Sequence, residues 1–77
     1  MDTRGGTAVL VDDDSIFREY ARELLESLAW TVHDFYDGAR MLAWLDGKPP
    51  PTFMILDMKM PGLDGPDVLR RAVARRR

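Results

Sequence analysis

The chain has 77 residues, 45% of them hydrophobic, and no cysteine, which excludes a disulfide framework and a thiolate metal site. A chain of this length forms one small domain that buries only about 60% of its unfolded surface. No apolar run approaches the roughly 20 residues of a membrane span, and no signal-peptide pattern opens the chain. We therefore expect a soluble cytoplasmic protein without a membrane partner.

The net charge of −2 is unevenly distributed. Residues 1–66 carry 6 basic and 12 acidic side chains, whereas residues 67–77 carry five arginines and one aspartate. These arginines fall at the end of an expected helix, where cations complement the helix dipole. No aromatic residues are interleaved with them and the rest of the chain is acidic, so we expect no nucleic-acid partner.

Three strand-like runs alternate with three amphipathic segments, after a polar lead at 1–7 that we expect to be flexible. The first and third runs are wholly apolar, as is typical of strands that are covered on both faces of a parallel sheet. The second run alternates weakly and favours an edge strand. The expected strands are 8–11, 31–35 and 53–57, and the expected helices are 15–28, 38–46 and 66–76.

The apolar residues of the helices recur at three- and four-residue spacing, which predicts one buried stripe on each helix. In the first helix we expect this stripe to contain Phe17, Tyr20, Ala21, Leu24, Leu25 and Leu28. In the third helix we expect Val68, Leu69, Ala72 and Val73 to face inward. Asp14 or Ser15 is expected to cap the first helix.

Two of the expected strands end in carboxylates. Asp12, Asp13 and Asp14 follow the run Ala8–Val11, and Asp57 follows Phe53–Leu56. If the two strands are parallel neighbours, their carboxyl ends meet at one edge of the sheet, where open α/β sheets bind ligands. Like charges at that distance raise each other's pKa unless a cation lies among them. The pattern favours a hard divalent ion with oxygen ligands, Mg²⁺ before Ca²⁺.

The segments L-V-D-D-D and D-M-K-M-P-G-L-D-G, at this spacing, resemble the receiver domain of two-component response regulators. The resemblance implies a flavodoxin-like α/β fold, here a partial βαβαβα unit over 8–77 with parallel strand order 2-1-3. It implies that Asp57 accepts a phosphoryl group from a sensor histidine kinase or a His-phosphotransfer protein, in a signalling module that is not an enzyme. The implied Mg²⁺ ligands are Asp12, Asp13, Asp57 and the backbone carbonyl of Lys59.

The family's fourth and fifth strands supply a Thr or Ser and a Lys that bind the phosphoryl oxygens, and this sequence has neither strand. Phosphoryl transfer depends on positioned positive charge, so we expect metal binding to survive and phosphorylation to be impaired. An alternative is a receiver-like interaction or dimerisation module that is not phosphorylated. Asp12-Asp13-Asp14 also loosely resembles the D-x-D motif of haloacid-dehalogenase-type phosphatases, a second alternative.

The third strand is expected to leave one edge unpaired within the chain. Its run Phe53–Leu56 contains no charge or proline that would discourage pairing with another chain. We also expect apolar surface from Val9, Val11, Met54 and Leu56 to lie open. The sequence therefore predicts a homodimer, or a complementing chain, that is joined through the edge of the third strand.

Overall fold

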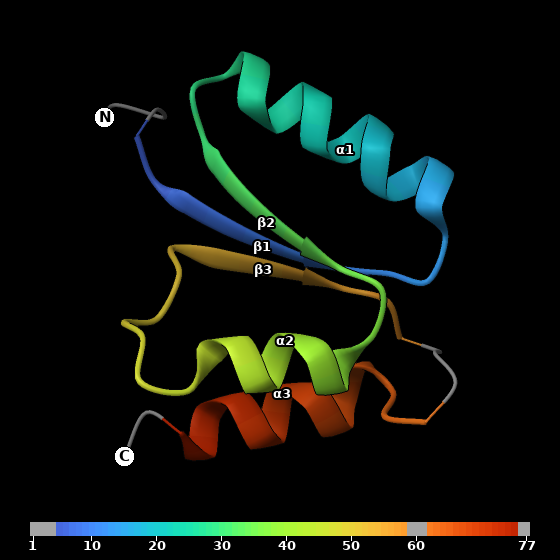
Figure 1. Ribbon diagram of the computed structural model, residues 1–77, viewed down its shortest axis with the longest axis vertical. Helices are drawn as coiled ribbons and strands as arrows, with labels where there is room; N and C mark the ends of the chain where they lie inside the picture. The colour runs from blue at the N-terminus through green and yellow to red at the C-terminus, as the bar shows by residue number, and fades with distance from the viewer. Residues whose placement is uncertain (1–4, 59–61, 76–77) are drawn as a thin grey trace.

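The computed structural model describes residues 5–58 and 62–75, and it contains a three-stranded sheet with helices on both faces. The strands are β1 (Thr7–Val11), β2 (Thr31–Phe35) and β3 (Phe53–Leu56). Helix α1 (Ser15–Ser27) covers one face, and α2 (Gly38–Leu45) and α3 (Gly65–Ala74) lie side by side on the other (Figure 1). All pairing is parallel in the order β2-β1-β3, which confirms the predicted fold and topology.

Strand β2 has the predicted bounds, and the other elements differ from theirs by one or two residues at their ends. Strand β1 begins at Thr7, one residue earlier than predicted, and β3 ends at Leu56, so that Asp57 lies just beyond the strand. Helix α1 ends at Ser27 because Leu28 and Ala29 form a tight turn, in which Ala29 has a φ of 65° and its N–H donates to the Glu26 carbonyl at 2.9 Å.

An aspartate caps the N-terminus of each helix. Asp14 Oδ1 accepts from the Ile16 and Phe17 N–H groups at 3.0 and 3.1 Å, so Asp14 caps α1 and Ser15, the other candidate, is the first residue of the helix. Asp37 caps α2 and Asp64 caps α3 in the same way. Because each cap satisfies backbone donors at a helix start, each helix can begin close to the strand end that precedes it.

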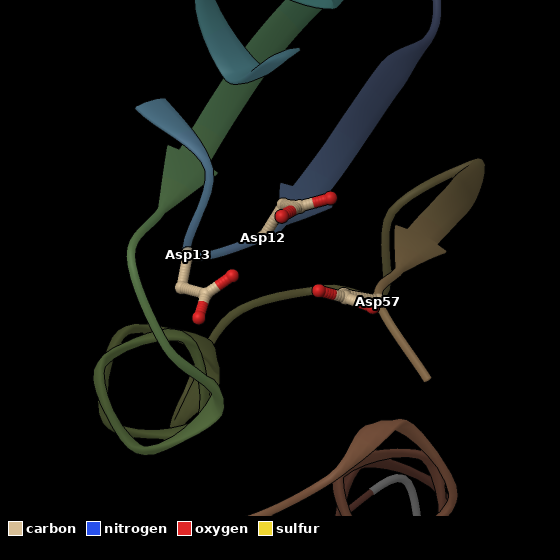
Figure 2. Close-up of side chains that lie close together, drawn as sticks. All are labelled: Asp12, Asp13 and Asp57. Carbon is tan, nitrogen blue, oxygen red and sulfur yellow. The ribbon is translucent and has the colours of Figure 1, made fainter. Parts of the chain in front are cut away.

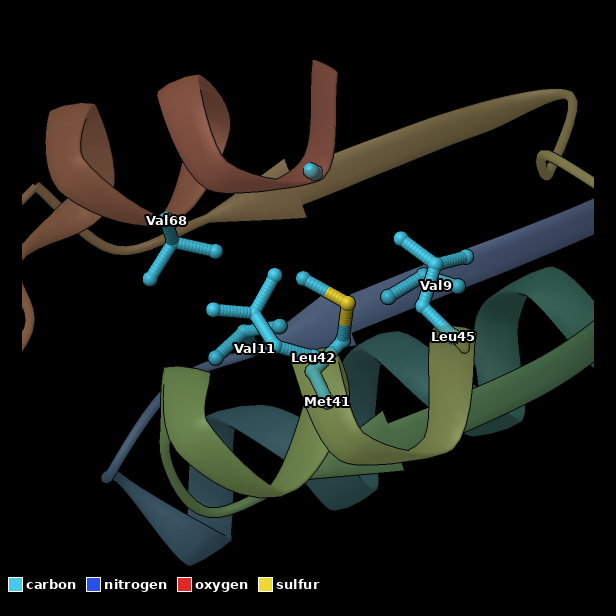
Figure 3. Close-up of a cluster of buried hydrophobic side chains, with 7 residues drawn as sticks. Val9, Val11, Met41, Leu42, Leu45 and Val68 are labelled. Atoms are coloured by element: carbon cyan, nitrogen blue, oxygen red, sulfur yellow. The ribbon is translucent and has the colours of Figure 1, made fainter. Parts of the chain in front are cut away.

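The main core lies between the sheet and the α2–α3 layer (Figure 3). Val9 and Val11 of β1 point into it and are fully buried, so the prediction that they lie open was wrong. The reason is that α2 and α3 alone cover the centre of this face, although Met54 and Leu56 of β3 are only half-buried. The buried members of this core are Val9, Val11, Met41, Leu42, Leu45, Val68 and Ala72.

The predicted buried stripe of α1 was wrong for most of its members. Ala21 is buried and Leu25 is half-buried, but Tyr20 is 67% exposed and Leu24 is 52% exposed. Helix α1 contacts mainly β2, with fewer contacts to β1, so that only one line of its residues meets the sheet. The stripe residues that remain exposed are Phe17, Tyr20, Leu24 and Leu28.

Helix α3 differs from its prediction in a similar way. Val68 and Ala72 are buried against the core, whereas Leu69 and Val73 are exposed. The latter two side chains line a groove of about 700 Å³ that also contains Met54 of β3. They were predicted to face inward because the apolar spacing does not tell which side of a helix has a neighbour.

Strand β3 pairs with β1 on one side, and within residues 5–58 and 62–75 no strand pairs with its other side. Met54 and Leu56 of β3 line the groove beside α3. In the same described ranges, no helix has the length and apolar character needed to cross a bilayer.

Candidate metal and phosphoacceptor site

The candidate site lies where β1 and β3 end. The Asp57 N–H donates to the Val11 carbonyl at 2.9 Å, and the Asp12 N–H donates to the Phe35 carbonyl at 3.2 Å. Both bonds continue the parallel ladders by one residue beyond the strands. The backbone of each aspartate is therefore held by the sheet, and the two side chains emerge at the same edge.

Asp12, Asp13 and Asp57 come together as the sequence predicted (Figure 2). One carboxylate oxygen from each residue lies within 4.8 Å of the corresponding oxygens of the other two, and all three residues are half-buried. Asp14 serves instead as the cap of α1. Lys59, the predicted fourth ligand, lies outside the described residues.

Burial and neighbouring like charges act on the Asp12 carboxylate. The pKa of Asp12 is raised above its ordinary value, first because burial removes the carboxylate from water and also because Asp57, Asp13 and Asp14 carry like charges. A hydrogen bond from the Asp14 N–H to Asp12 Oδ1, at 2.9 Å, acts in the opposite direction. A cation among these oxygens would remove the repulsion.

The donor set fits Mg²⁺. Hard carboxylate oxygens are its preferred protein ligands, and it is usually held by one or two carboxylates together with several waters. Asp12, Asp13 and Asp57 provide such oxygens from two strand ends. The half-buried position of these three residues also leaves room for water in the coordination shell.

Arg18 contacts the backbone of Asp12, although the sequence analysis did not single it out. Its Nη1 donates to the Asp12 backbone carbonyl at 2.8 Å, and its Nε donates to Asp34 Oδ2 at 3.2 Å. The sequence places Arg18 on the polar side of α1, but it contains no signal for contacts with residues 6 and 16 positions away. Only the packing of α1 against β2 brings these groups together.

Gly65 fixes the other side of the site. It is the first residue of α3, and its N–H lies 3.4 Å from the Met58 carbonyl. A Cβ at this position would lie only 2.6 Å from the Asp57 carbonyl oxygen and 3.1 Å from the Met58 Cα. The start of α3 can therefore approach the end of β3 this closely only because residue 65 has no side chain.

Comparison with known proteins identifies the family of the chain. The family model for the response regulator receiver domain matches residues 8–77. The chain belongs to the receiver-domain family. Receiver domains are signalling modules, and this assignment places the chain among response regulators rather than with the phosphatases that have a D-x-D motif.

The relatives of this receiver chain include the transcriptional regulatory protein FixJ from Bradyrhizobium diazoefficiens, with 36% identity over 94% of this chain and 35% of FixJ. The crystal structure of full-length FixJ from B. japonicum superposes with a TM-score of 0.80 and 33% identity, over 97% of this chain and 36% of that chain. The solution structure of the beryllofluoride-activated NtrC receiver domain gives a TM-score of 0.77 and 34% identity, over 91% of this chain and 56% of that chain. The receiver chain thus spans about a third of the length of FixJ.

Removing one negative charge should stabilise this receiver in the absence of metal. We expect Asp13→Asn to raise the midpoint of thermal unfolding in a chelator-containing buffer, because it relieves repulsion with Asp12 and Asp57 in a shape-conserving way. The gain should be about 0.5–1 kcal/mol, as for other half-exposed charge interactions. Differential scanning fluorimetry measures it.

The same variant should gain less stability from added Mg²⁺ than the original chain gains. The exposed Glu23→Gln, which removes a charge on α1 away from the cluster, is the matched control and should leave the response to Mg²⁺ unchanged. Equal stabilisation of Asp13→Asn and the original chain by Mg²⁺ would remove Asp13 from the ligand set.

Proposed function

We propose that residues 8–77 act as a phosphoacceptor receiver module that binds Mg²⁺ and accepts a phosphoryl group on Asp57. The observation that carries the proposal is the convergence of three carboxylates from the ends of β1 and β3 to within 4.8 Å of one another. Family membership supplies the reaction class. The phosphoryl donor is a phosphorylated histidine of a sensor kinase or of a His-phosphotransfer protein.

Asp57 is the group that performs the transfer. One oxygen of its carboxylate attacks the phosphorus atom, an O–P bond forms, and the P–N bond to the donor histidine breaks. The imidazole nitrogen leaves with the bonding electron pair and takes up a proton. Phosphoryl transfer requires positive charge close to the reacting atoms, and a bound Mg²⁺ would provide this charge next to the oxygens of the transferred phosphoryl group.

Asp12 and Asp13 hold the metal ion in this proposal. Their backbone lies at the carboxyl end of β1, held through the Asp12 N–H bond to Phe35, so they present oxygens toward Asp57 without a change in the sheet. The backbone carbonyl of Lys59 is the further proposed ligand.

The test of this function is labelling of the isolated chain. Incubation with a small acyl phosphate and Mg²⁺ should add one phosphoryl group to part of the protein, as measured by intact-mass spectrometry, and chelation of the metal should prevent the addition. Beryllofluoride, which activates the related NtrC receiver domain, is a second probe that mimics the phosphoryl group.

A second candidate function is an interaction module that pairs through β3. The observation that favours it is the one-sided pairing of β3 beside an apolar groove that contains Leu69 and Val73 of α3.

Sedimentation velocity at micromolar concentration distinguishes this second candidate. A homodimer that dissociates when Leu69→Lys is introduced into the groove is the expected result, since the exposed position tolerates a lysine in a monomer. A well-folded monomer across the concentration range would reject homodimerisation. If that monomer is also labelled on Asp57, the phosphoacceptor function is the only one of the two candidates that remains.

A further inference from the structure

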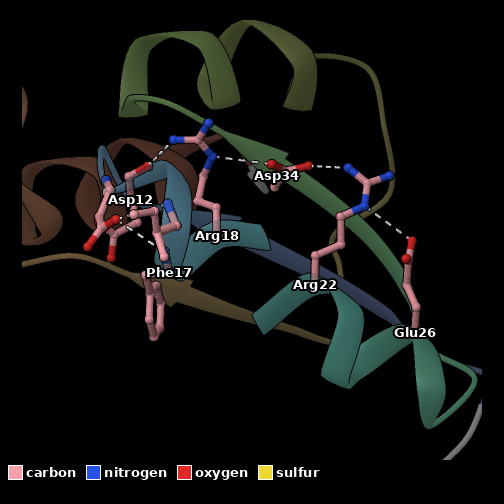
Figure 4. A network of polar contacts seen from close by, with 8 residues as sticks. Asp12, Phe17, Arg18, Arg22, Glu26 and Asp34 are labelled. Carbon is pink, nitrogen blue, oxygen red and sulfur yellow. Dashed lines mark hydrogen bonds and ion pairs between the residues drawn. The ribbon is translucent and has the colours of Figure 1, made fainter. Parts of the chain in front are cut away.

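The Arg18 side chain connects three segments of the fold (Figure 4). It starts from α1, donates to the Asp12 carbonyl in the β1–α1 loop at 2.8 Å, and donates to Asp34 of β2 at 3.2 Å. The Arg18 side chain is only 18% exposed and that of Asp34 is 20% exposed. The pair is therefore partly shielded from solvent, and removal of one partner would leave the other charge partly desolvated and without its ion-pair partner.

Asp34 is itself held in place. Its Oδ2 binds Arg18 Nε, and its Oδ1 is paired with Arg22 Nη1. Arg22 in turn binds Glu26 at 3.2 Å one turn further along α1. Because both carboxylate oxygens of Asp34 are engaged, the carboxylate has a defined orientation and fixes the plane of the Arg18 guanidinium.

The contact that matters for the site is the one to the Asp12 carbonyl. This carbonyl belongs to the same rigid peptide unit as the Asp13 N–H. The preceding N–H of Asp12 is bound to Phe35, and Asp12 Oδ1 accepts from the Asp14 N–H. Arg18 binds the carbonyl of the Asp12–Asp13 peptide, and the bonds of the Asp12 and Asp14 N–H groups hold the backbone before and after it. These bonds together set the directions in which the Asp12 and Asp13 side chains leave the backbone.

We propose that Arg18 is a positioning residue for the metal site, anchored by Asp34 and acting through the Asp12 carbonyl. The inference rests on the proposed function, because it concerns the same Mg²⁺ ligands. It extends that function because Arg18, which is not one of the proposed metal ligands, would keep Asp12 and Asp13 in the positions needed to bind the metal.

A purely electrostatic role for Arg18 predicts the opposite result. Removing a positive charge near three carboxylates would strengthen cation binding, whereas removing a positioning contact weakens it. A purely structural role, in which Arg18 only ties α1 to β2, predicts a loss of stability with unchanged Mg²⁺ affinity. The sign of the affinity change therefore separates the three roles.

The test compares Arg18→Lys and Arg18→Met with the control Arg22→Lys. Lysine keeps the charge but cannot make both of the bonds that Arg18 makes. Methionine removes the charge and both bonds and keeps only the unbranched apolar part of the side chain. Arg22 shares the Asp34 carboxylate but has no hydrogen bond to Asp12. Mg²⁺ affinity is measured by titration at a temperature where thermal unfolding shows each variant to be folded.

Both Arg18 variants should bind Mg²⁺ about tenfold more weakly or worse, in the range found for outer-shell partners of metal ligands, while Arg22→Lys should change affinity less than about twofold. If Arg18→Met does not fold, Asp34→Asn is used in its place to weaken the ion pair that holds Arg18. This variant should also lower the affinity for Mg²⁺. Unchanged or tighter binding in a folded Arg18 variant would overturn the inference.

A metal-free readout separates failure of this inference from failure of the proposed function. In chelator-containing buffer, the ¹H–¹⁵N signal of the Asp13 amide should shift in Arg18→Lys and stay in place in Arg22→Lys, because the Asp13 N–H shares a peptide with the Arg18-bound carbonyl. If the original chain binds no Mg²⁺, the proposed metal site fails. If the Asp13 signal does not move in Arg18→Lys, the positioning role fails whatever the metal does.

Discussion

Asp57→Asn is expected to abolish phosphoryl incorporation while leaving the fold nearly unchanged. The neutral amide of asparagine has the shape of the carboxylate but is not a nucleophile toward phosphorus, whereas the backbone bond from residue 57 to the Val11 carbonyl is kept. The substitution also removes one of three mutually repelling charges, so the midpoint of thermal unfolding should stay the same or rise. Intact-mass spectrometry after incubation with a small acyl phosphate and Mg²⁺ measures the effect.

The extent of labelling in the original chain should be partial and slow. The three carboxylates that converge at the site supply no positive charge, so a bound Mg²⁺ would carry most of the charge compensation at the phosphoryl oxygens. Asp14→Asn is the matched control, because asparagine caps a helix as well as aspartate does and should leave labelling unchanged. Persistent labelling of Asp57→Asn would assign the phosphoryl group to a different residue.

Gly65→Ala should have the largest effect of any single methyl addition at the site. The added Cβ would lie 2.6 Å from the Asp57 carbonyl oxygen, and this neighbour is backbone that cannot rotate away. Either the start of α3 or the end of β3 must move, which costs about 1–3 kcal/mol or more. In a small domain this is a large share of the total stability. Movement of Asp57 should also weaken Mg²⁺ binding.

Gly47→Ala provides the comparison for Gly65→Ala. Gly47 has a φ of 75° and open space around its Cα, so an alanine there is strained by its backbone conformation but meets no neighbour. It should lose about 1 kcal/mol and keep its Mg²⁺ affinity. Chemical denaturation and Mg²⁺ titration of both variants test the pair. A Gly65→Ala variant that is as stable as Gly47→Ala would show that α3 can retreat from β3 at little cost.

The arrangement of the acid cluster could be predicted because it follows from local patterns. An apolar run that ends in Asp12 and Asp13, and another that ends in Asp57, place carboxylates at strand ends. The parallel β2-β1-β3 order, which was expected from the family resemblance, then brings these ends to one edge. Helix starts were predictable for the same reason, since an aspartate cap such as Asp14 acts on backbone groups two and three residues away.

The sequence by itself therefore determined the order of the elements, the cap of α1 and the three aspartates that the fold brings together. Only the tertiary structure decided which apolar positions are covered, as at Tyr20 and Leu24, because helical spacing defines a face but not the neighbour that buries it. It also decided the contacts that hold the site, Arg18 to the Asp12 carbonyl and Gly65 beside Asp57. These contacts join segments whose distance depends on how whole helices pack against the sheet, and no local pattern encodes that distance.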